Sequence, residues 1–130
     1  MGTIYNEPIL AIGVPNRNGR VYARHAVENA LNNSAKTISG KIGMEYEEGK
    51  PYNDAREITH WCSNLRIEGE QLVADVRFKE NVEGRMLESM VRKGAYVFRT
   101  ASLVHQIGEN AVVNSFTIIS INAVIAVNAA

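Results

Sequence analysis

The residues best suited to chemistry in this sequence are its three histidines, its single cysteine and its serines. His60 and Cys62 are two residues apart in a strand-like segment, so both side chains are expected on one face. This pair would supply two ligands, whereas a structural zinc site usually has four, and we expect no metal site. His25 is expected to be solvated on a helix, and His105 is expected in a turn.

Ser102 is the serine best placed to act as a nucleophile, because it lies in a strand-like segment on the same face as Phe98 and Thr100. A nucleophilic serine needs a base within hydrogen-bond reach, and His60 is the strand histidine that could supply one. His60 and Ser102 are therefore the alternative catalytic pair. The sequence has no Gly-x-Ser-x-Gly elbow and no glycine-rich phosphate-binding pattern, so we expect no cofactor.

The stretch PNRNGRVY, Pro15 to Tyr22, could be either a basic binding site or a turn. Its two arginines could bind phosphate, but the formal net charge of the chain is +0. Proteins that bind nucleic acid usually carry a basic excess, because phosphate contacts supply much of their affinity. Asparagine and glycine tolerate positive φ, and asparagine side chains bond to nearby backbone. The stretch is therefore predicted to be a structural turn, and no nucleic-acid partner is expected.

Hydrophobic periodicity predicts the elements that position these residues. Helices are predicted over 23–33 and 81–94, and strands over 9–14, 38–46, 57–67, 72–78 and 95–104, with one or two further strands towards the C-terminus. Most neighbouring strands lack a helical crossover, so the expected fold class is α+β, a compact mixed or antiparallel, barrel-like sheet with two helices. The 130 residues are expected to form a single domain, 1–130, with residues 1–8 as a candidate extended N-terminal arm.

Side-chain patterns assign faces to two of these elements. In the predicted hairpin, the buried face of the second strand should consist of Leu72, Ala74, Val76 and Phe78. In the second helix, Asn81 is predicted to cap the N-terminus. The buried stripe of this helix is predicted to consist of Met86, Leu87, Met90 and Val91. No segment is long and apolar enough to span a bilayer, so no membrane partner is expected.

Taken in order, several segments resemble the bacteriophage prohead (head maturation) protease family. The stretch NRNGRVY resembles the opening signature of that family, through Asn16, Arg17, Asn18, Gly19, Arg20 and Tyr22. The segment ITHWCSNLRIEGEQLVADVRF is similar to the family's Trp-x-Glu-Gly hairpin, and EGRMLESMVRKG is similar to its next helix. The likeness runs from about Ile9 to Ala130 and implies an assemblin-like, prohead-protease fold.

Three positions depart from the histidine, serine and acidic residue that the resemblance implies for catalysis. Met44 occupies the position at which the family has its histidine. Val97 and Phe98 occupy the positions of the family's two adjacent serines, and Asn122 occupies the position of its aspartate. Methionine cannot accept a proton from a hydroxyl, and valine and phenylalanine are not nucleophiles. Asparagine cannot stabilise an imidazolium as a carboxylate does. The chain is therefore expected to be a pseudoenzyme with no catalytic residues.

We expect a non-enzymatic phage virion protein, a capsid decoration or cement protein that binds the major capsid protein and stabilises the head. It would be assembled in the host cytoplasm and lie on the outer surface of the virion, as a homo-oligomer or beside neighbouring copies. The candidate contact residues are Tyr5, Tyr46, Tyr52 and Arg56. One alternative is an active prohead serine protease that cleaves scaffold and capsid proteins with His60 and Ser102. The other is an internal scaffold-core protein with the same inactive fold.

Overall fold

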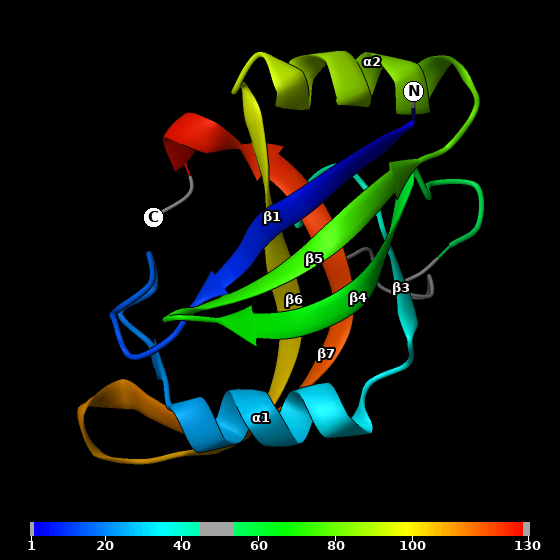
Figure 1. Ribbon diagram of the computed structural model, residues 1–130. Coiled ribbons are helices and arrows are strands. Elements are labelled where there is room, and N and C mark those ends of the chain that lie inside the picture. The colour runs from blue at the N-terminus through cyan, green and yellow to red at the C-terminus, as the bar shows by residue number, and fades with distance from the viewer. Residues whose placement is uncertain (1, 45–53, 129–130) are drawn as a thin grey trace.

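The computed structural model describes residues 2–44 and 54–128, so Tyr46 and Tyr52 lie outside the described residues. In chain order (Figure 1), the elements are β1 (Thr3–Ala11), β2 (Val21–Tyr22), α1 (Arg24–Asn33), β3 (Thr37–Gly40), β4 (His60–Glu68), β5 (Gln71–Phe78), α2 (Val82–Arg92), β6 (Tyr96–Ile107) and β7 (Val112–Ile125). Short 3-10 helices follow β6 at Glu109–Ala111 and β7 at Ala126–Asn128. Both predicted helices are present, and the α+β fold class is confirmed.

The described strands form two sheets. The first has the order β1, β5, β4, β3 and is antiparallel throughout. The second has the order β2, β7, β6, with β6 antiparallel and the two-residue β2 parallel to β7. The mixed or antiparallel arrangement is therefore confirmed. Within residues 2–44 and 54–128 the strands do not close into one barrel, because β1 and β6 are edge strands of separate sheets, and this corrects the barrel-like expectation.

The N-terminal residues belong to the first sheet rather than to an extended arm. Residues 3–8 are part of β1, whose pairing with β5 runs from Thr3 opposite Arg77 to Ala11 opposite Gln71. The carbonyl of Gly2 also accepts a hydrogen bond of 2.7 Å from the backbone N–H of Phe78. This pairing gives partners to backbone groups of residues 2–11, which explains why the segment forms a strand.

The hydrophobic core lies between the two sheets. Figure 1 shows β1, β5 and β4 crossing in front of β6 and β7, with α1 below the sheets and α2 above them. The predicted hairpin face is buried as expected, through Leu72, Ala74, Val76 and Phe78. Large, fully buried side chains from the other layers pack with it: Ile9, Val27, Leu87, Phe98, Val113 and Ile121.

The second helix begins at the predicted cap but buries a different stripe. The Asn81 side chain accepts a hydrogen bond of 2.8 Å from the backbone N–H of Gly84. Gly84, Leu87 and Val91 are buried, and their i, i+3, i+7 spacing makes them the face towards the sheets. Met86 and Met90 lie off this face and are exposed, so their predicted burial is wrong.

Two strand ends also differ from the sequence-based prediction. The predicted strand over 38–46 ends as β3 at Gly40, after which residues 41–43 bond to β7. The strand predicted to end at residue 104 continues to Ile107, so His105 lies in β6 and the turn comes after Gly108. Across residues 2–44 and 54–128, none of the helices has the length and apolar character needed to cross a membrane.

Candidate functional site

The β6–β7 ladder places the family-matched positions on two faces. Val97 and Arg99 alternate with Phe98 along β6, and Arg99 lies directly across from Asn122 on β7. Residues that oppose each other in an antiparallel pair share a face. Val97, Arg99 and Asn122 therefore share one face, and Phe98 faces the other way, into the core. Of the two residues that match the paired serines, Val97 is the one on the face of Asn122.

Asn122 is 2% exposed, and both ends of its amide have partners. Its Oδ1 accepts a hydrogen bond of 3.2 Å from the backbone N–H of Lys41. Its Nδ2 lies 3.6 Å from the sulfur of Met44, to which it donates. The structure thus brings together Met44 and Asn122, which are 78 residues apart in the sequence. A thioether is a weak acceptor and neither group titrates, so this contact holds the segment after β3 on β7 without offering a proton relay.

Phe98 is a core residue with no exposed surface. Its ring packs edge-on against the imidazole of His60, with ring centroids 4.8 Å apart and an angle of 63° between the planes. The ring of Phe78 packs on the same pair of rings, with its centroid 6.2 Å from that of Phe98. These contacts between β4, β5 and β6 fill the space between the sheets.

His60 is fully buried, and each ring nitrogen has a partner. The Nε2–H donates to the carbonyl oxygen of Ile121 at 2.6 Å, and Nδ1 accepts from the hydroxyl of Thr59 at 2.9 Å. Nε2 carries the proton because a carbonyl can only accept. Burial lowers the pKa of His60 to about 4, although the bond to Ile121 favours the charged form. His60 is therefore a neutral side chain that links β4 to β7 across the core.

Ser102 is not hydrogen-bonded to His60. Its hydroxyl donates to Oγ1 of Thr100, two residues away on β6, at 3.2 Å. Both nitrogens of His60 bond elsewhere, so the structure does not assemble the alternative catalytic pair. Ser102 instead lies on the wall of a surface groove.

This groove, of about 990 Å³, lies between the β1 edge, the turn after β1 and the β6–β7 ladder. Met44, Arg99 and Ser102 line it, together with Arg17 and Arg20 from the predicted turn. The family-like turn and part of the matched site therefore share one depression. The described residues that line it include no histidine, cysteine, aspartate or glutamate. These residues offer cations and hydroxyls but no carboxylate or imidazole to act as a general base.

Arg99 is a half-buried cation in this groove. Its Nη1 donates to the carbonyl oxygen of Phe98 at 2.7 Å, and burial lowers its pKa. An arginine stays charged even so. No local pattern pointed to the groove, because its walls come from segments that are far apart in the sequence. The signal available was the resemblance of the turn and of the position of Met44 to the same family.

The stretch Pro15–Tyr22 forms the predicted turn. The Asn16 side chain accepts hydrogen bonds from the backbone N–H groups of Asn18 and Arg20, at 2.9 and 3.0 Å. The turn leads directly into β2, where the side chain of Tyr22 is buried. Asn16 therefore acts on its own backbone, as the asparagine chemistry predicted.

The fold is similar to that of a phage protease. A solved structure of the bacteriophage T4 capsid assembly protease, gp21, matches with a TM-score of 0.65 at 19% sequence identity, over 95% of this chain and 91% of that chain. The prohead-protease-like fold implied by the sequence is thereby confirmed. No protein-family model matches the sequence, and no curated protein matches it.

The remaining candidate residues lie apart from the groove. His25 is exposed on α1, and His105 pairs with the hydroxyl of Thr117 at 2.7 Å between β6 and β7. Cys62 is buried, and burial, with a smaller effect of the Glu7 carboxylate, raises its pKa to about 12. The described ranges contain no cluster of three or more metal-ligating side chains.

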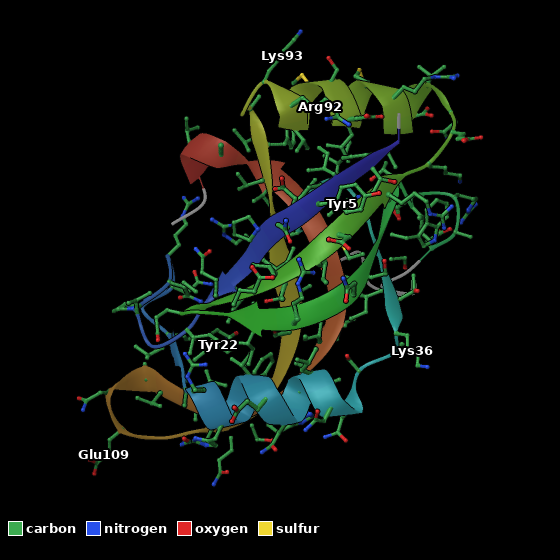
Figure 2. All side chains as sticks on the ribbon, in the orientation of Figure 1. Tyr5, Tyr22, Lys36, Arg92, Lys93 and Glu109 are labelled. Carbon is green, nitrogen blue, oxygen red and sulfur yellow. The ribbon has the colours of Figure 1, made fainter. Side chains whose placement is uncertain are left out.

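Two candidate contact residues can be placed. Tyr5 is 67% exposed on β1 (Figure 2), where the register with β5 is irregular. Arg56 is also exposed, and its guanidinium bonds to the Asp54 carboxylate at 3.1 and 2.8 Å. Of the candidate contact residues that the structure describes, Tyr5 is therefore the aromatic one, and its side chain is exposed for contact with a partner protein.

Proposed function

We propose that this chain is a non-enzymatic bacteriophage head protein, a decoration or cement protein that binds the major capsid protein and stabilises the head. Two findings support the proposal. The fold is similar to that of a capsid assembly protease, and the matched catalytic positions hold side chains that cannot do its chemistry. The observation that carries it is the contact between Met44 and Asn122, because a proteolytic site needs a base and a carboxylate there.

Attachment to a head depends on surface complementarity rather than on a reactive group. Tyr5 is suited to this role, because a large exposed aromatic side chain can bury much area at a small cost in conformational entropy. Its place on the edge strand β1 leaves it open to a neighbouring protein. Decoration would place the chain on the outer surface of the virion, beside other copies of itself.

The direct test is the copy number of the chain on purified mature heads. A decoration protein should co-purify at a fixed ratio to the major capsid protein, and should be removed by protease added to the outside of intact heads. Absence from mature heads would overturn the proposal. Protection from external protease, with a few copies per head, would instead indicate an internal core protein.

Loss of the Tyr5 ring should weaken head binding. We expect Tyr5→Ala to reduce the affinity for heads at least about tenfold, the effect of an interface anchor. Tyr5→Phe keeps the ring and serves as the matched control. Thermal unfolding of both variants should stay close to that of the wild type, because the side chain is exposed. Equal head binding by Tyr5→Ala and the wild type would remove Tyr5 from the interface.

Proteolysis is the competing function, and it is tested separately. The purified chain is incubated with scaffold and capsid proteins, and the products are followed over time. Cleavage that is abolished by Ser102→Ala would overturn the non-enzymatic proposal and make the protein a prohead protease.

A further inference from the structure

The outer face of α2 carries an apolar stripe with opposite charges at its two ends. Val82, Met86 and Met90 are 72%, 56% and 37% exposed, and they recur every four residues. Glu83 lies in the first turn and Lys93 immediately follows the last one. At 100° per residue, all five positions fall within one arc of roughly 100° on the helix. This surface, Val82, Glu83, Met86, Met90 and Lys93, is called the α2 stripe below.

The charged side chains at the ends of the α2 stripe form no ion pair with the described residues of the chain. Neither Glu83 nor Lys93 has an ion-pair partner among the residues that the structure describes. By contrast, Arg92 pairs with Glu88 at 2.8 Å and also donates to the carbonyl of Thr3. Figure 2 shows Lys93 pointing away from the protein at the end of α2. The α2 stripe is thus both exposed and electrostatically unpaired at its ends.

We propose that the α2 stripe is an interface between two copies of this chain, with the helices antiparallel about a two-fold axis. Glu83 and Lys93 are each five residues from Glu88, and Met86 and Met90 are each two residues from it. A two-fold axis near Glu88 therefore brings Glu83 level with the partner's Lys93, and Met86 level with the partner's Met90. Each contact occurs twice in such an isologous pair.

The pattern favours a second copy over an unrelated partner because the stripe complements itself. A parallel pair would set like charges together at both ends, which is unfavourable. In the antiparallel pair the charges match, and flexible methionines can fill the space between the helices. The aliphatic stem of the partner's Lys93 can also lie along Val82 while its ammonium reaches Glu83.

The contact is small, and its strength depends on how the copies are held. The stripe is roughly 17 Å long at 1.5 Å per residue, so the buried area falls below that of a standard stable interface. We therefore expect weak, concentration-dependent pairing in solution. If the proposed function is right, copies fixed side by side on a head have a high effective concentration, and the same contact would tie neighbours together.

The first test is analytical ultracentrifugation of the purified chain over a concentration series. The average mass should rise from monomer towards dimer as concentration increases, and Met86→Glu should abolish the rise. Leu103→Glu is the matched control, because Leu103 is similarly exposed, at 52%, but lies on β6. A wild-type chain that stays monomeric up to millimolar concentration would overturn the inference, as would unchanged pairing of Met86→Glu.

Charge reversal gives a sharper test of the antiparallel geometry. Glu83→Lys or Lys93→Glu alone should weaken pairing about tenfold, since each change sets like charges together twice. The double variant Glu83→Lys/Lys93→Glu should recover wild-type pairing. The two single variants, mixed, should form a heterodimer tighter than either homodimer. A double variant no tighter than the singles would contradict the arrangement.

Folding and head binding are read out separately from pairing. Circular dichroism establishes that each variant is folded, which is expected because all the changed side chains are exposed. Heads that fail to bind a chain that pairs through α2 would refute only the proposed function. Heads decorated by a chain that never pairs would refute only this inference.

Discussion

His60 illustrates how a residue that could do chemistry becomes structural. In the sequence it was the candidate base for Ser102. In the structure its imidazole spans the core, from Thr59 on one side to the carbonyl of Ile121 on the other. Ile121 is 61 residues away along the chain. No local sequence pattern could therefore show that the ring nitrogens of His60 already have hydrogen-bond partners.

The burial of neutral His60 makes the stability of the fold depend on pH. Its folded pKa, about 4, lies below the ordinary value of 6.5. The unfolded state therefore takes up the proton first, and stability falls as the pH drops from about 6.5 to about 4, by about 3 kcal/mol in all. Above about pH 6.5 the contribution of His60 is fully present.

Chemical unfolding of the wild type and of His60→Gln across this range measures the effect. Glutamine can still donate to the carbonyl of Ile121 but does not titrate. The stability advantage of the wild type should therefore shrink as the pH falls, while contributions from other titrating groups cancel in the difference. An advantage that is independent of pH would show that His60 is not buried in its neutral form.

At the same scale, the sequence aligned Met44 and Asn122 with the family's catalytic positions but did not predict that they are in contact. The match to Met44 and Asn122 required only the order of motifs. Their meeting, through a thioether and an amide, depends on residues 41–43 bonding to β7 after β3 ends. The predicted strand over 38–46 missed this, because hydrophobic pattern does not say when a strand changes its partner.

Among the elements, β3 shows how closely the sheets approach each other. A Cβ on Gly40 would clash with the carbonyl oxygen of Ile121 and with Nε2 of His60. Glycine is therefore required at this position by the contact between the sheets and not by a turn. A sequence alone shows the glycine but not the strand that passes over it.

Gly40→Ala should destabilise the protein strongly. The added methyl group cannot be accommodated without moving β3 away from β7, and overpacking of this kind costs about 3 kcal/mol or more. Ser39→Ala, on the same strand, is the control and should cost less than about 1 kcal/mol. The measurement is the free energy of unfolding in denaturant, and equal stability of the two variants would contradict the close approach.

The cap of α2 is a second element-scale feature, and it was visible in the sequence. Asn81→Ala removes the acceptor for the backbone N–H of Gly84 and should cost about 1 kcal/mol. Asn81→Asp keeps an acceptor in place and should retain most of the stability. Thermal unfolding of the two variants distinguishes them, and a loss of the same size in both would mean that the cap is not what Asn81 contributes.

For the whole molecule, the sequence predicted the elements better than their assembly. Turn chemistry and alternation located both helices and the β4–β5 hairpin, because those signals are local. The pattern left one or two strands open at the C-terminus, where the structure has the single strand β7. The division into two sheets was not predicted, since β1 pairs with β5 and β2 with β7 across large sequence separations. The exposed methionines of α2 were misplaced for the same reason: their burial depends on how the helix sits on the sheets.

Backbone hydrogen bonds join the two sheets between β3 and β7, and at the turn after β1, where Gly13 bonds to Tyr22 of β2. This pattern gives the molecule a preferred direction of opening. Residues 41–43 join β3 to β7 through backbone hydrogen bonds, whereas β1 and β6 form no strand pairing within residues 2–44 and 54–128. Fluctuations should therefore part the sheets at the β1–β6 side first, with the backbone at 41–43 as the hinge. Amide hydrogen exchange should be fastest along the edge strands β1 and β6 and slowest in β5 and β7. A force that pulls on the N-terminus should therefore separate β1 from β5 before the rest of the fold unfolds.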